Sequence, residues 1–220
     1  MDTKVTFSPQ RLRYLQLLSK QHPTVQSAST EIIKLRAILN LPKGTEHFMS
    51  DIHGEHEAFL HILNSSSGEV KEKLNEMFGE RMSEQEINDI ATLIYYPEAK
   101  LNMMSHCQDD MDQWYSKIID LLVNFCRFVS VKHTRAKVRS YIPAGYEQLI
   151  EEVLNLCDED GFQKDLYGTI ISSIIRLGQA PDVIQAICTV IKAMTCDYLH
   201  IVGDIFDVLP AFVDAFKAAK

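Results

Sequence analysis

Two short segments, each followed by an aspartate, flank a long stretch of helical periodicity, and this arrangement constrains the fold most. Residues 46–50 precede Asp51-Ile52-His53-Gly54, and residues 198–202 precede Gly203-Asp204. Short apolar runs that end at turn residues are typical of strands. We therefore expect two strands, far apart in the sequence, that each deliver an acidic side chain where the strand ends.

The sequence between these segments predicts helices almost throughout residues 68–195. Ser83 with Glu86 forms a capping-box pattern ahead of an apolar run. Gly178 and Pro181 indicate the end of one helix and the start of the next. The predicted amphipathic segments of this block include residues 87–94, 111–131, 146–156, 166–177 and 183–194.

Outside the block, apolar spacing predicts a helix near residues 32–39, a second over 55–63 and a short last helix over 209–220. We predict an α+β fold that is predominantly helical, in three regions. Residues 1–64 hold an N-terminal helix and the first strand, loop and helix. Residues 65–196 are a helical insertion, and residues 197–220 hold the second strand and a tail.

The charge balance argues against polyanionic partners. The chain has 22 basic and 30 acidic residues, a net charge of -8, and so lacks the basic footprint of a nucleic-acid-binding protein. No apolar run approaches the roughly 20 residues of a membrane span, and residues 1–10 lack a signal-peptide core. We expect a cytoplasmic protein that binds neither nucleic acid nor membrane.

The five cysteines are odd in number and contain no Cys-x-x-Cys pair. Neither a zinc site nor a disulfide framework is indicated, so we expect reduced and mostly packed thiols.

Asp51 and His53 are candidate metal ligands because a carboxylate and an imidazole two residues apart can converge on one cation at the end of a strand. Taken alone, Asp51 is also a suitable cap for the following helix. Asp204 would emerge at the end of its strand in the same way. The alternative interpretation of this segment is a turn with two polar residues.

Taken together, Asp-x-His after one strand and Gly-Asp-x-x-Asp after another resemble the calcineurin-like metallophosphoesterases. The resemblance implies Asp51, His53 and Asp204 as metal ligands, with Asp204 bridging two metals, and Asp207 as the residue that holds the next arginine. Two metals suit phosphate-ester hydrolysis because they acidify a bound water and neutralise phosphoryl charge. Oxygen and imidazole donors fit manganese, magnesium or iron, and we expect manganese.

A wider resemblance points to class III fructose-1,6-bisphosphatases. It is carried by residues 35–48, Ser50-Asp51-Ile52-His53-Gly54-Glu55, Tyr95-Tyr96-Pro97-Glu98 and His200-Ile201-Val202-Gly203-Asp204-Ile205. It implies hydrolysis of the 1-phosphate of a sugar bisphosphate, fructose 1,6-bisphosphate, in gluconeogenesis. It also implies a partial metallophosphoesterase sandwich of about two strands, whose large helical insertion accounts for the 153 positions (204 − 51) between the motifs.

The pattern departs from that family after Asp207. An arginine that contacts phosphate is implied there, but the sequence has Val208-Leu209-Pro210, and valine cannot replace a forked cationic donor. The implied later Gly-Asn-His segment, with further metal ligands and the acid histidine, has no counterpart in the 220 residues. We therefore expect a truncated form with no identifiable catalytic acid, and His47, His56, His61 and His200 as surface or core residues.

Two other hypotheses stay open at this point. One is a non-catalytic helical interaction module or inactive remnant of the family. The other is a phosphoprotein phosphatase that shares only the metal motifs, although the helical insertion argues against it. In any of these, the unpaired edges of a two-stranded sheet favour self-association, so a homo-oligomer is also expected.

Overall fold

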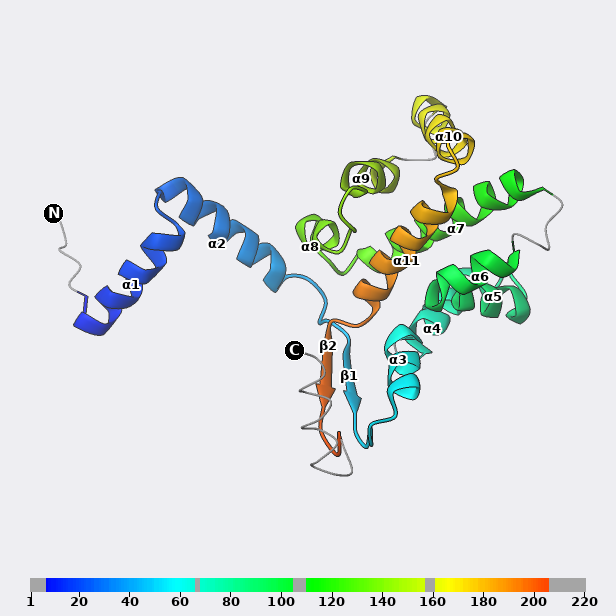
Figure 1. The fold of residues 1–220 in the computed structure, drawn as a ribbon. Coiled ribbons are helices and arrows are strands. Elements are labelled where there is room, and N and C mark those ends of the chain that lie inside the picture. Colours follow the sequence, from blue (N-terminus) through cyan, green and yellow to red (C-terminus); the bar gives the residue numbers. More distant parts are fainter. Residues whose placement is uncertain (1–6, 66–67, 105–109, 157–160, 206–220) are drawn as a thin grey trace. The chain divides into compact units, whose positions relative to one another are not determined.

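The computed structural model of the chain describes residues 7–65, 68–104, 110–156 and 161–205. The chain divides into two compact units, Met1–Pro42 and Lys43–Lys220. The elements are α1 (Pro9–Gln21), α2 (Val25–Leu39), β1 (Glu46–Met49), α3 (His56–Ser65), α4 (Glu69–Phe78), α5 (Glu84–Tyr95), α6 (Pro97–Met104), α7 (Met111–Ser130), α8 (Arg135–Ser140), α9 (Glu147–Asn155), α10 (Gly161–Arg176), α11 (Ala180–Thr195) and β2 (Tyr198–Ile201) (Figure 1). The predominantly helical α+β prediction is confirmed, with helices far outnumbering strands.

The first unit contains α1 and α2, and both helices begin at capping side chains. Ser8 accepts a hydrogen bond from the amide of Arg11, and Thr24 and Ser27 form a reciprocal capping box. Neither helix contains a buried residue. The predicted helix near residues 32–39 is the second half of α2, but its apolar side chains remain exposed.

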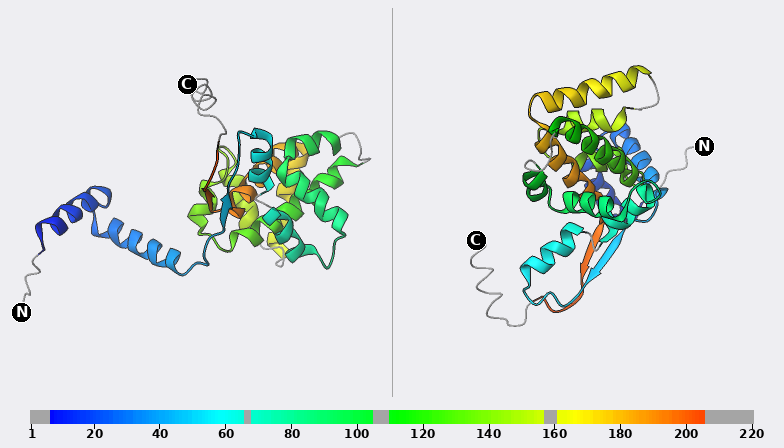
Figure 2. Two further views of the ribbon diagram at one scale, coloured as in Figure 1. Left: turned by 90° about the horizontal axis from the view of Figure 1, so that it is seen from below. Right: turned by 90° about the vertical axis from the view of Figure 1, so that its right-hand side faces the viewer.

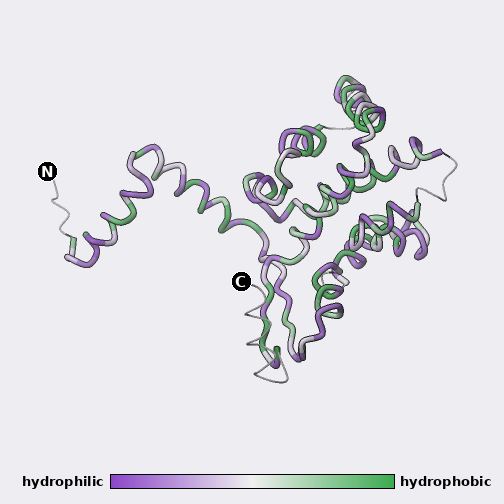
Figure 3. Tube along the Cα trace, in the orientation of Figure 1, coloured by the Kyte–Doolittle hydropathy of each residue, from purple (hydrophilic) through white to green (hydrophobic). Residues whose placement is uncertain are grey.

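The second unit is organised around α11, which is buried for most of its length. Ile184, Ile187 and Ile191 are at most 1% exposed, and α11 lies beside α7 in two further views (Figure 2). The long helix α7 packs along it and contributes Leu122 and Phe125 to the same core. Hydrophobic residues recur along both helices (Figure 3), as expected for elements that face one another across a core.

The helix boundaries follow the local signals in the sequence. Ser83 and Glu86 form the predicted capping box, with the Ser83 amide 2.8 Å from Oε2 of Glu86. Gly178 has a φ of 69°, which a glycine adopts without strain, and it follows α10 as predicted. Pro181 lies in the first turn of α11. Amides in the first turn have no hydrogen-bond partner within the helix, so the missing amide hydrogen of proline costs nothing there. Pro97 not only closes α5 but begins α6.

The two strands form a parallel pair, with Glu46 opposite Tyr198 and Met49 opposite Ile201. Both predicted strands are therefore present and adjacent, although the helical block separates them in sequence. In the described residues this pair is the whole sheet, and it does not by itself establish a sandwich.

A buried carboxylate joins the beginning of this sheet to the helical block. The Asp197 side chain, 1% exposed, lies next to the ammonium groups of Lys137 and Lys132, the latter at 3.4 Å. Lys132 also donates to the hydroxyl of Thr45 at 2.6 Å. Burial alone would raise the pKa of Asp197, but hydrogen bonds from Lys137 and Thr45 and the nearby positive charges hold it below its ordinary value.

No single helix in the described ranges is long and apolar enough to cross a membrane; only α10 and α11 taken together pass by length and composition, and they are bent by 117° at their break. Cys126 and Cys188 are buried free thiols and Cys196 is half-buried. Cys107, Cys157 and the helix predicted over residues 209–220 lie outside the described residues.

Candidate metal centre

The first part of the candidate site is the loop between β1 and α3. Asp51 and His53 both have a positive φ, 54° and 49°, in the left-handed region that non-glycine residues seldom adopt. Such a conformation costs of order 1 kcal/mol or more for each residue. The conformation of a loop with two such residues must be held by its surroundings. Backbone strain of this kind is concentrated at functional sites.

Backbone hydrogen bonds to the segment after β2 hold this loop. The amide of His53 donates to the carbonyl of Asp204 at 3.1 Å, and that of Gly54 donates to the carbonyl of Ile205 at 2.9 Å. The amide of Val202 donates to the carbonyl of Met49 at 2.9 Å, which extends the strand pairing. The two predicted motifs are thus hydrogen-bonded directly to each other, although the sequence of neither motif indicates that it pairs with the other.

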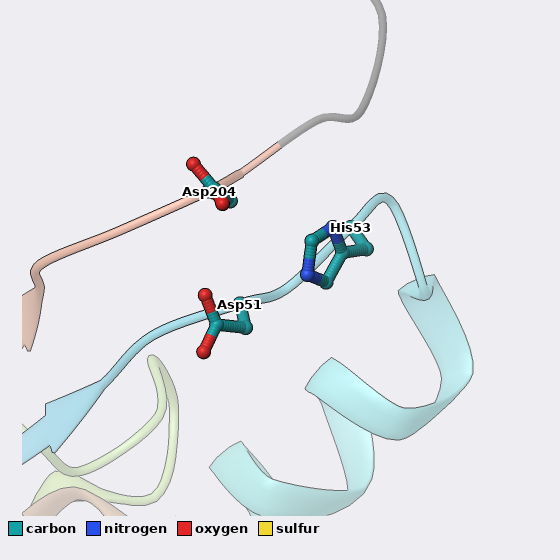
Figure 4. A group of neighbouring side chains, drawn as sticks. All are labelled: Asp51, His53 and Asp204. Atoms are coloured by element: carbon teal, nitrogen blue, oxygen red, sulfur yellow. The ribbon is translucent and has the colours of Figure 1, made fainter.

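The side chains of Asp51, His53 and Asp204 come together at this edge of the sheet (Figure 4). One potential ligand atom from each lies within 4.8 Å of the others, and all three side chains are exposed. The hydroxyl of Ser50 donates to Oδ2 of Asp51 at 3.1 Å, which orients that carboxylate. Sequence reasoning did not single out Ser50, although its place beside Asp51 was the available signal.

The geometry is close to that of a cation site. Two ligands on opposite sides of one ion, each bonded at about 2.2 Å, are at most about 4.4 Å apart. Three ligands equally spaced around one ion are about 3.8 Å apart, so the observed separations of up to 4.8 Å require each exposed ligand atom to move by at most about 0.6 Å. Two carboxylates and an imidazole, with no thiolate, suit a harder divalent ion.

The other candidate residues contribute differently. Asp207 lies outside the described residues, so its predicted role is not tested. His200 stacks on Phe48 with ring centroids 4.6 Å apart and lies 3.4 Å from Glu46. His61, on α3, is hydrogen-bonded to the hydroxyl of Tyr96 at 2.5 Å. That contact links α3, the helix after the Asp51–His53 loop, to the end of α5.

A family comparison decides the relationship of the chain. The sequence profile of the family described as Firmicute fructose-1,6-bisphosphatase matches residues 13–212. The chain belongs to this family. The match includes Asp51, His53, Asp204 and Asp207 as well as the whole helical block.

Individual relatives of the family give the same result. The chain is 50% identical over 196 residues to a fructose-1,6-bisphosphatase class 3 of Alkaliphilus metalliredigens and 51% identical over 196 residues to one of Bacteroides fragilis, in each case over 89% of this chain. It is 48% identical over 200 residues to a protein of the same name from Phocaeicola vulgatus, over 91% of this chain. The chain spans about 30% of the length of these relatives. No solved structure matches it significantly.

Proposed function

We propose that this chain provides the first two metal-binding segments of a class 3 fructose-1,6-bisphosphatase, which hydrolyses the 1-phosphate of fructose 1,6-bisphosphate in gluconeogenesis. The observation that carries the proposal is the convergence of Asp51, His53 and Asp204 in a chain half identical to proteins of that name. Asp51 and His53 would hold one divalent ion, and Asp204 would serve both ions of a pair. Asp207, after the second strand, supports the ligands.

The donor set supports a divalent ion, and manganese is the metal we propose. When bound, a metal pair acidifies water and neutralises charge on the phosphoryl oxygens. The residues of this chain contribute position: the strained loop holds Asp51 and His53, and its hydrogen bond to the Asp204 carbonyl fixes the second segment beside it. Ser50 orients the Asp51 carboxylate by donating a hydrogen bond to it.

The proposal includes an architecture for the family. The two-stranded sheet is the beginning of a metallophosphoesterase sandwich, into which the helices of residues 65–196 are inserted. Residues 1–64 and 197–220 supply the flanking segments of that sandwich. The protein works in the cytoplasm, with a sugar bisphosphate as substrate, and associates with further copies through open strand edges.

A second candidate is a non-catalytic helical interaction module. Two observations favour it: the helical block has a complete core of its own, and valine at position 208 replaces the arginine expected after Asp207. This candidate predicts weak metal binding, so a tight site for two ions would reject it.

Metal binding by the chain is the first test. Titration with Mn²⁺, followed by calorimetry and electron paramagnetic resonance, is expected to show saturable binding. Asp51→Asn should weaken it by at least about tenfold, because an anionic ligand becomes a neutral amide. Glu76→Gln makes the same change of charge at an exposed residue of α4 and should leave binding unchanged. Equal binding by wild type and Asp51→Asn would contradict the assigned site.

Catalysis requires a test in the full family architecture. In a chimera, residues 13–207 would replace the matching segment of the Alkaliphilus metalliredigens relative, and phosphate release from fructose 1,6-bisphosphate would be followed with Mn²⁺ present. We expect activity that Asp51→Asn abolishes and Glu76→Gln retains. A folded, metal-loaded chimera with no activity would favour the interaction module.

A further inference from the structure

A cleft of about 670 Å³ lies between the end of α7, helix α8 and helix α9. Its volume is in the range of sites that hold small organic ligands. Its walls come from the helical block alone, and they include none of Asp51, His53 and Asp204.

The lining of this cleft is positively charged, in contrast to the chain as a whole. It contains Arg127, Arg135 and Arg139 against one carboxylate, Glu151, which leaves two positive charges (three minus one) in a chain of net charge -8. Burial lowers the pKa of His133, which disfavours a positive charge on that ring. By comparison, a cleft of about 450 Å³ beside α5 balances two lysines with two carboxylates.

Arg127 is a fixed positive charge in the wall of the cleft. Its guanidinium donates to the carbonyls of Leu154, at 3.2 Å, and Val153, at 2.8 Å, near the end of α9. It also lies 5.9 Å from the centre of the Tyr167 ring. These contacts offset the negative end of the α9 dipole and hold the side chain in one position.

The other two arginines have donors that a ligand can use. Arg135 is exposed and has no ion-pair partner anywhere in the described ranges. Arg139 is exposed and lies 3.4 Å from Glu151 through its Nε, which leaves the two terminal nitrogens of the guanidinium. Planar guanidinium forks match phosphate oxygens with paired hydrogen bonds, and lysines do so less well.

We propose that this cleft binds a small phosphate ester, with Arg135 and Arg139 on the phosphate oxygens and Arg127 supplying a fixed charge. A phosphate group, rather than a single carboxylate, suits two forks beside a third cation. The site is separate from the proposed metal centre and would exist whether or not the chain is catalytic.

Calorimetric titration of the whole, metal-free chain with inorganic pyrophosphate tests the proposal. The whole chain is used so that the measured affinity includes the charges of Asp158, Glu159 and Asp160, which lie outside the described residues. We expect saturable binding that Arg135→Gln combined with Arg139→Gln weakens at least about tenfold, from the loss of two charge-assisted contacts. Glu151→Gln removes the opposing carboxylate and should tighten binding by about threefold. Titrations with ribose 5-phosphate and with uridine 5′-monophosphate show whether the ligand carries a nucleobase.

Two control variants distinguish binding in this cleft from a general effect of surface charge and from binding at the metal centre. Arg81→Gln with Arg176→Gln removes the same charge from exposed residues elsewhere on the helical block and should change the affinity less than about twofold. Asp51→Asn should also leave the affinity unchanged. Absence of saturable binding, equal loss in the two double variants, or loss in Asp51→Asn would each overturn the proposal.

Discussion

The amide of Thr45 donates a hydrogen bond of 3.0 Å to the carboxylate of Asp197, across 152 positions of sequence. Thr45 immediately precedes β1 and Asp197 immediately precedes β2, so the bond joins the strands where they begin. The Asp51 and Asp204 segments follow the opposite ends of the same strands. One buried carboxylate therefore joins the starts of the two strands whose far ends carry the candidate ligands.

Substitution Asp197→Asn is expected to lower the free energy of unfolding by about 3 kcal/mol, as for the loss of one member of a buried ion pair. Asparagine retains an oxygen for the Thr45 amide but leaves Lys132 and Lys137 without their countercharge. Urea unfolding followed by circular dichroism measures the change. Asp165→Asn, at an exposed position of α10, is the control and should shift stability by less than about 0.5 kcal/mol. Similar effects of the two substitutions would show that the Asp197 contacts contribute little.

Wild type and Asp197→Asn should differ in how the free energy of unfolding depends on pH. Because the pKa of Asp197 is lowered in the folded state, its contribution is complete above the ordinary carboxyl pKa of about 4. That contribution is lost as the pH falls from there through the lowered value. The stability difference between wild type and Asp197→Asn should therefore shrink on acidification from neutral pH to about pH 3. A difference that stays constant over this range would mean that another group dominates.

Gly44 should be intolerant of a side chain because the buried Asp197 side chain lies against it. A Cβ at this position would lie 2.8 Å from Oδ2 and 2.9 Å from Cβ of Asp197, and Asp197 cannot retreat without losing its partners. We expect Gly44→Ala to destabilise the chain by roughly 1–3 kcal/mol. Gly168→Ala, in α10 with nothing within 4 Å of its Cβ, should instead stabilise it by about 0.5–1 kcal/mol. Thermal unfolding of the two variants distinguishes these opposite signs.

Local signals in the sequence predicted local structure well. The Ser83–Glu86 capping box, the helix start at Pro181 and both strands follow from residues that are neighbours in sequence. The convergence of Asp51, His53 and Asp204 required one further step, the pairing of two strands, and the motif order supplied it.

Contacts between distant residues could not be predicted in this way. Nothing near Asp197 in sequence indicates Thr45 or Lys137, and nothing near Tyr96 indicates His61. Apolar spacing likewise predicted the helix at residues 32–39 but not that its apolar side chains are exposed, because periodicity identifies a face and not its partner. The left-handed φ of Asp51 was also hidden, since aspartate adopts several turn conformations.

The cysteines of the helical block provide a test of its packing. Burial raises the pKa of both Cys126 and Cys188 to about 12, so at about pH 8 each carries far less thiolate than an ordinary cysteine. We expect both to resist iodoacetamide in the native protein and to react in concentrated urea, as read by mass spectrometry of peptides. Cys196, which is half-buried, should react faster than either and serves as the internal reference. Rapid native alkylation of Cys188 would mean that α11 opens readily, and the core that encloses this helix would then be much less stable than its burial indicates.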